Sequence, residues 1–126
     1  MQRQKLLLPA IDAALQAGKA ILEVYRTDFS VESKSDRSPL TLADKKSHDI
    51  IVSGLAESAL PILSEEGRAV LFARRRAWET LWIVDPLDGT KEFVKRNGEF
   101  TVNIALVHRG RPVMGVIFVP VTGVLY

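Results

Sequence analysis

The chain has 126 residues, of which 47% are hydrophobic and 25% charged, proportions typical of one folded domain with its own core. Its 17 basic and 15 acidic side chains give a net charge of +2, which calls for no nucleic-acid partner, and the absence of cysteine excludes disulfides. The amino-terminal apolar stretch ends at Pro9, too early for a secretory signal or a transmembrane segment. We therefore expect a cytoplasmic protein, either free or peripheral on the cytoplasmic face of the inner membrane.

Two helices are expected in the first half of the chain. From Leu7 to Tyr25, apolar residues recur every three or four positions, the spacing of an amphipathic helix. Residues 27 to 40 are polar and predict a loop. A second helix is expected to start with Thr41 as N-cap and Asp44 at the third helical position, and to end before Pro61. This capping role would explain Asp44 without catalysis, and a catalytic role is the open alternative.

The second half of the chain predicts a sheet, because short apolar and β-branched runs alternate with turns. The expected strands lie at 62–63, 82–84, 101–107, 113–119 and from 123 onward, and the third and fourth of them form a hairpin. A short helical turn is expected between Gly89 and Val94. Helices followed by strands indicate a single α+β unit.

The most informative motif is the run Asp85-Pro86-Leu87-Asp88-Gly89-Thr90, which directly follows an expected buried strand. Pro86 fixes one backbone angle and Gly89 permits a tight approach, so the chain can fold back on itself. Asp85 and Asp88 would then point at one place. Two carboxylates about 4 Å apart repel by about 4 kcal/mol at an effective dielectric constant near 20, which a cation would offset. The alternative is an ordinary strand-to-helix turn capped by Asp88.

Further residues point to a metal site combined with a phosphate site. Glu65, at the end of the preceding expected strand, would supply a third carboxylate from a separate part of the chain. A set of oxygen ligands favours Mg²⁺ over zinc. If Gly89 and Thr90 open a helix, their amides present free N–H groups to a phosphate. His48 and His108 lack partners at ligand spacing and are expected at the surface.

The same region resembles a known family. The run from Trp82 to Phe93, WIVDPLDGTKEF, resembles the signature of the lithium-sensitive inositol monophosphatase superfamily. Its continuation through RNGEFTVNIA, residues 96–105, resembles the 3′(2′),5′-bisphosphate nucleotidase branch of that superfamily. Ser64-Glu65-Glu66 is similar to the acidic turn of the family, and residues 38–44 to its segment before the second helix. The likeness extends over essentially the whole chain.

This resemblance implies a layered sugar-phosphatase fold with a mostly antiparallel sheet flanked by helices. Residues 1–126 would be its amino-terminal metal-binding domain, and the second domain, which supplies a further aspartate ligand, would be absent from this chain. The implied activity is Mg²⁺-dependent hydrolysis of the 3′-phosphate of adenosine 3′,5′-bisphosphate, with 3′-phosphoadenylyl sulfate as a second substrate, in sulfur metabolism. The alternatives are an inositol-phosphate phosphatase and a catalytically inactive fragment.

The resemblance also implies roles for individual residues. Metal would be bound by the carboxylates of Glu65, Asp85 and Asp88 and the backbone carbonyl of Leu87. Asp44 and Thr90 would orient and help deprotonate the attacking water. The residues implied to contact the substrate are Glu65, Leu87, Asp88, Gly89 and Thr90. Without the second domain, an apolar sheet edge or face would be exposed, and we expect self-association through it.

Overall fold

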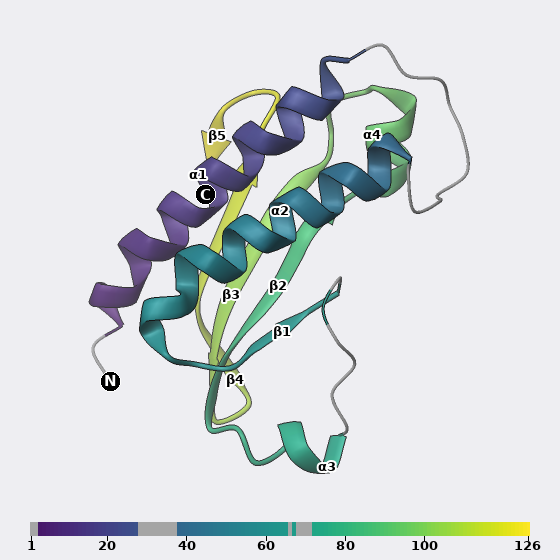
Figure 1. Cartoon of the computed structure of the whole chain (residues 1–126). Coiled ribbons are helices and arrows are strands. Elements are labelled where there is room, and N and C mark those ends of the chain that lie inside the picture. The colour runs from purple at the N-terminus through teal and green to yellow at the C-terminus, as the bar shows by residue number, and fades with distance from the viewer. Residues whose placement is uncertain (1–2, 28–37, 66, 68–71) are drawn as a thin grey trace.

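In the residues that the structure describes, 3–27, 38–65, 67 and 72–126, two long helices lie side by side over one face of a five-stranded sheet (Figure 1). This is a computed structural model. The helical elements are α1 Gln4–Tyr25, α2 Pro39–Leu55, the short 3₁₀ helix η1 Ala56–Ser58, α3 Phe72–Arg75 and α4 Thr90–Lys95. None of the helices in these ranges is long and apolar enough to cross a membrane.

The sheet is mostly antiparallel, as predicted. Its strands are β1 Ile62–Ser64, β2 Thr80–Asp88, β3 Thr101–His108, β4 Arg111–Val119 and β5 Val124–Leu125. They are ordered as numbered, with β1 parallel to β2 and the other neighbours antiparallel. The α+β class, the long first helix, the helical turn after Gly89 and the β3–β4 hairpin are therefore confirmed.

Helix α2 begins earlier than the sequence indicated. Its N-cap is Ser38, whose Oγ accepts a hydrogen bond from the Thr41 backbone N–H at 3.0 Å, and Pro39 occupies the first helical position. The prediction of Thr41 as N-cap is therefore wrong by one turn of helix. Asp44 lies inside the helix and is only 2% exposed, so the capping explanation for this residue no longer applies.

Strand β2 also differs from the prediction, because it continues through the acidic motif to Asp88. Asp85 pairs with Asn103 and Asp88 with Thr101, so the bulged side has one residue more than the opposite strand. The extra residue lies at Pro86-Leu87, both buried. A bulge tolerates proline, which has no N–H to give to a β-ladder.

The core lies between the two long helices and the sheet. The core includes the small α1 residues Ala10, Ala13, Ala14 and Ala17, and α2 approaches α1 closely where Gly54 meets Ala13. Gly18 of α1 faces Phe118 of β4 instead. At the carboxyl end of α1, Tyr25 packs against the rings of Phe93 and Phe100, with ring centroids 5.4 and 4.9 Å away. Trp82 is fully buried, and its Nε1 donates to Ser58 Oγ at 3.0 Å. These contacts join the end of α1 to α4 and to Phe100, and η1 to β2.

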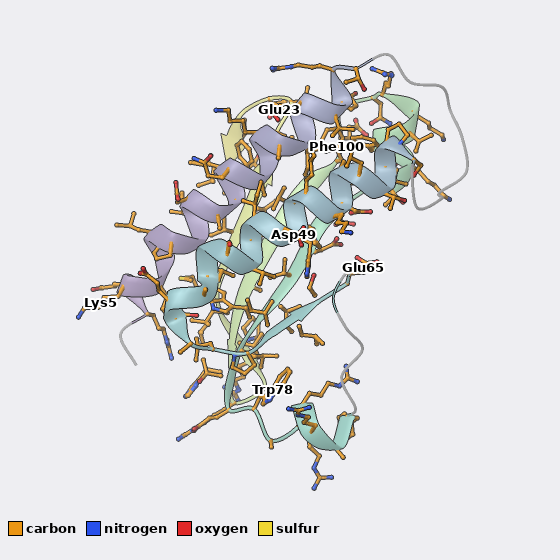
Figure 2. The ribbon with its side chains drawn as sticks, in the orientation of Figure 1. Lys5, Glu23, Asp49, Glu65, Trp78 and Phe100 are labelled. Atoms are coloured by element: carbon orange, nitrogen blue, oxygen red, sulfur yellow. The ribbon has the colours of Figure 1, made fainter. Side chains whose placement is uncertain are left out.

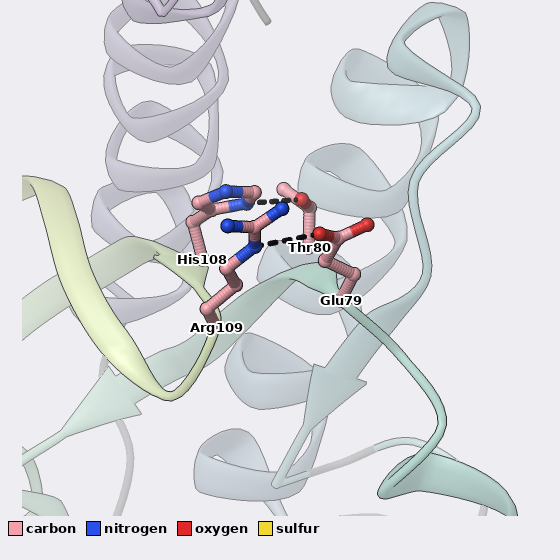
Figure 3. A network of polar contacts seen from close by, with 4 residues as sticks. All are labelled: Glu79, Thr80, His108 and Arg109. Atoms are coloured by element: carbon pink, nitrogen blue, oxygen red, sulfur yellow. Dashed lines mark hydrogen bonds and ion pairs between the residues drawn. The ribbon is translucent and has the colours of Figure 1, made fainter.

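A polar network joins the beginning of β2 to the β3–β4 hairpin (Figure 3). Thr80 Oγ1 and His108 Nδ1 are hydrogen bonded at 2.7 Å, and Arg109 Nε donates to Glu79 Oε1 at 2.7 Å. The Arg109 hydrogen bond and charge hold the pKa of the Glu79 carboxyl below its usual range. Both partners of that ion pair are exposed, so the pair adds little to stability. His108 is half-buried rather than simply at the surface.

The sheet face opposite the helices is open and partly apolar. Ile83 on β2 and Ile117 on β4 are 42% and 44% exposed. A hollow of about 660 Å³ extends over this face and reaches Glu65 and Asp85 at one end. The open face and the acidic motif are therefore continuous.

We predict that Gly18→Ala destabilises the chain, because Cβ would approach Cδ2 of the Phe118 ring to 2.6 Å. Alanine favours a helix by about 1 kcal/mol over glycine. Overpacking a core costs about 1–3 kcal/mol, and subtracting the helix gain leaves an expected net loss of up to about 2 kcal/mol in the free energy of unfolding, measured in urea. The matched control is Gly115→Ala, where no atom lies within 4 Å of the new Cβ. Equal stability of the two variants would contradict this account of the contact between α1 and Phe118 of β4.

Candidate functional site

The parallel pairing of β1 with β2 brings two acidic strand ends together. Ser64 pairs with Val84, and the Glu65 backbone N–H donates to the Val84 carbonyl at 3.3 Å. Glu65 therefore lies at the tip of β1 (Figure 2). Its side chain is hydrogen bonded to Asp85 of β2. We call Glu65, Asp85 and Asp88 the acidic site. Of the three side chains, Glu65 and Asp85 are hydrogen bonded to each other, and the negative charge of Asp88 acts on Asp85.

Asp85 has the most perturbed environment in this site. Burial raises its pKa to about 7, assisted by a hydrogen bond with Glu65 and by the negative charges of Glu65 and Asp88. The Leu87 backbone N–H acts in the opposite direction. Within the described ranges, Oδ1 of Asp85 is a buried oxygen without a hydrogen-bond partner. Asp85 thus combines an unsatisfied oxygen with an unfavourable charge, and a cation would relieve both.

Asp88 is exposed and held from the neighbouring strand. Its Oδ2 accepts a hydrogen bond from Asn103 Nδ2 at 3.0 Å, and Asn103 Oδ1 accepts one from Thr101 Oγ1 at 3.0 Å. The bulge in β2 sets this register, since Asn103 pairs with Asp85 and bonds to Asp88. Sequence reasoning did not assign Asn103 a role, because the register of β2 against β3 cannot be read from either strand alone.

The donor set of the acidic site fits a hard divalent cation. Its ligand atoms are carboxylate oxygens, and the Leu87 carbonyl lies in the bulge between them. In the described parts of the chain, no group of three or more His, Cys, Asp or Glu side chains is already arranged to hold a metal ion. Glu65 and Asp85 are instead hydrogen bonded to each other.

The turn after Asp88 has the backbone geometry that the motif predicted. Gly89 has a φ of +90°, the left-handed region that favours glycine, and caps the short helix α4 at Thr90. A Cβ at Gly89 would lie 3.3 Å from the Phe100 Cα, so the chain passes close to a neighbouring backbone there. Thr90 itself is exposed. The phosphate contacts assigned to these two residues stay predictions.

Helix α2 presents three polar side chains on one stripe, at positions 44, 47 and 48. Asp44 and Ser47 are buried, and Ser47 Oγ donates to the Pro86 carbonyl at 2.7 Å. His48 Nδ1 is hydrogen bonded to Ser64 Oγ at 2.8 Å. The expectation that His48 is a surface residue is therefore wrong, since its ring is half-buried between α2 and the end of β1. The sequence did contain a signal for this arrangement, because residues three and four positions after Asp44 lie on the same side of a helix as Asp44.

A sequence profile of the inositol monophosphatase family matches residues 2–126. The chain is 50% identical over 117 residues to the 3′(2′),5′-bisphosphate nucleotidase CysQ of Shigella flexneri, covering 90% of this chain and 47% of that protein. The protein of the same name from Escherichia coli K12 matches with the same identity and coverage. The chain thus spans about half the length of the curated relatives it matches.

Solved structures of similar proteins indicate the same family. The crystal structure of CysQ from Bacteroides thetaiotaomicron superposes with a TM-score of 0.89 at 62% identity, over 94% of this chain and 44% of that one. An inositol monophosphatase from Staphylococcus aureus superposes with a TM-score of 0.80 at 27% identity, over 97% and 45% of the respective chains. The described fold is therefore the fold of these two solved structures, and the layered architecture expected from the sequence is confirmed.

The environment of Asp85 predicts an inverse pH dependence of stability without metal. The ordinary pKa of this carboxyl is 3.8, so the folded state, with a pKa of about 7, binds the proton more tightly than the unfolded state does. The free energy of unfolding should therefore fall as pH rises from about 4 to about 7 and then level off. Urea unfolding in EDTA across this range measures it.

The control for this prediction is Asp85→Asn, which removes the titrating group while keeping the shape of the side chain. We expect the variant to lose most of the decline between pH 4 and pH 7. A wild-type stability that rises over the same interval, or a decline that persists unchanged in the variant, would contradict the assignment.

Proposed function

The chain belongs to the inositol monophosphatase family, and on this premise we propose that its acidic site binds Mg²⁺ for hydrolysis of the 3′-phosphate of adenosine 3′,5′-bisphosphate. The family consists of phosphatases that generally use metal ions. The observation that carries the proposal is the buried, unpaired Oδ1 of Asp85 beside a second carboxylate, that of Glu65. Such an oxygen in a negatively charged site is a natural ligand for a hard cation.

In this proposal, metal is held by the carboxylates of the acidic site and by the backbone carbonyl of Leu87. A bound divalent ion supplies positive charge that stabilises the reacting phosphate and eases deprotonation of water. Asp44 and Thr90 orient the attacking water and help to deprotonate it. The backbone amides of Gly89 and Thr90 hold the phosphate, and Glu65, Leu87 and Asp88 also contact the substrate. Residues 1–126 then constitute an amino-terminal metal-binding domain.

The nucleotide is favoured over an inositol phosphate as substrate by the degree of similarity. Proteins named as 3′(2′),5′-bisphosphate nucleotidases are 50% identical to this chain, whereas the inositol monophosphatase from Staphylococcus aureus is 27% identical. A second substrate, 3′-phosphoadenylyl sulfate, a role in sulfur metabolism and a cytoplasmic location belong to the same proposal. The alternative is a fragment that binds metal without turnover.

Mg²⁺ titration calorimetry combined with phosphate-release assays tests this proposal. We expect the chain to bind Mg²⁺, and any turnover to be faster with adenosine 3′,5′-bisphosphate than with inositol 1-phosphate. Asp85→Asn should weaken Mg²⁺ binding by at least tenfold, because it removes a charged ligand. The matched control is Asp49→Asn, the same chemical change on the exposed side of α2.

The outcomes of this test separate the candidate functions. Mg²⁺ binding without phosphate release favours the inactive fragment, and preferential release from inositol 1-phosphate favours the inositol-phosphate phosphatase. If wild type and Asp85→Asn fail alike to bind Mg²⁺, the proposed metal site is wrong.

Self-association through the open sheet face is a further prediction of this proposal. Ile117 is 44% exposed on that face. Ile117→Lys should lower the mean mass measured by light scattering at high concentration, because a charge is costly to bury in an apolar contact. Leu8→Lys, at a residue 73% exposed on α1, is the matched control. A wild-type chain that stays monomeric at millimolar concentration would contradict this prediction.

A further inference from the structure

We propose that Ser47 and His48 of α2 are positioning residues that together fix the distance between the two strand ends of the acidic site. The inference rests on the proposed metal site and adds to it the parts of the chain that determine its geometry. Neither residue contacts the metal in this proposal. Each acts through a hydrogen bond to the residue next to a ligand, one in β2 and one in β1.

Ser47 acts on the β2 side. Its side chain is fully buried, and its Oγ donates to the Pro86 carbonyl at 2.7 Å. In the described strands, Pro86 lies in the bulge between the paired residues Asp85 and Asp88, so β3 does not fix its backbone. The hydrogen bond from Ser47 takes over that function. It anchors the peptide between the two carboxylates of the β2 strand end.

His48 acts on the β1 side. Its Nδ1 is hydrogen bonded at 2.8 Å to Oγ of Ser64, the last residue of β1 and the neighbour of Glu65. In the sheet as described, β1 is a three-residue strand at the edge, paired with β2 alone. So short an edge strand is held by few ladder hydrogen bonds. The His48 imidazole attaches the carboxyl end of β1 to α2 as well. Gly67, just after β1, also lies close to this ring, since a Cβ on Gly67 would be 3.4 Å from His48 Cε1.

The two hydrogen bonds come from consecutive residues of one helix. Because both strand ends are attached to the same turn of α2, the helix fixes the distance between them. Adjacent positions on an α-helix point about 100° apart, so one turn of α2 can reach both strands. The helix is packed on both α1 and β2. A metal ion demands ligand positions defined to a few tenths of an ångström, and hydrogen bonds around the ligands commonly supply that definition.

Mn²⁺ binding by the 126-residue chain, measured by calorimetry, tests the inference without relying on activity. Ser47→Ala and His48→Phe should each weaken Mn²⁺ binding roughly tenfold. Loss of a hydrogen bond that orients a metal ligand typically lowers metal affinity by about 10- to 100-fold, and we expect the lower value. His48→Asn should restore most of the affinity, because its amide can place a hydrogen-bonding atom near the position of Nδ1. A structural role without positioning would not predict this rescue.

Ser58→Ala is the matched control, because Ser58 Oγ also links the helical layer to β2, through Trp82 Nε1 at 3.0 Å. It should lower the unfolding temperature in EDTA while leaving Mn²⁺ affinity within about twofold of wild type. Wild-type binding with unchanged affinity in Ser47→Ala and His48→Phe overturns the positioning role alone, as does equal weakening by Ser58→Ala. A wild-type chain that binds no Mn²⁺ overturns the metal site and the positioning role together.

Discussion

The parallel pairing of a three-residue strand, β1, with β2 is the constraint on which the site depends. Because the strands run in the same direction, their carboxyl ends meet, and Glu65 comes to lie beside Asp85. The cost of this arrangement is visible in Asp85, whose pKa rises to about 7 through burial and neighbouring negative charge. The fold thus holds together groups that repel one another, and a divalent cation at this place would offset the repulsion.

The rest of the described structure supports this unfavourable contact. Small residues on α1 allow α2 to pack closely, and α2 in turn contacts β2 along the core. The bulge at Pro86-Leu87 redirects β2 so that Asp88 reaches Asn103. Rigid packing distant from the site therefore maintains a local electrostatic strain, as is usual where a site is organised before its ligand arrives.

The two faces of the sheet have different chemistry. The helix side is a closed apolar core, whereas the open side carries exposed Ile83 and Ile117 and a hollow that ends at the acidic pair. Because the hollow and the carboxylates are continuous, a molecule that covers the open face also changes the solvation of Asp85. Burial of that carboxylate strengthens its interaction with a cation, so occupancy of the face and metal affinity are physically linked.

The sequence by itself determined the features that depend on local patterns: the amphipathic first helix, the positions of the strands, the turn at Gly89 and the acidic motif that resembles a family signature. It misplaced the start of α2, because Ser38 and Thr41 are both acceptable caps and only the packing of the helix selects one. It also missed His48 and Asn103, whose roles arise from contacts with residues 16 and 15 positions away. Those pairings depend on strand register and helix orientation, which the packed core decides and no local pattern encodes.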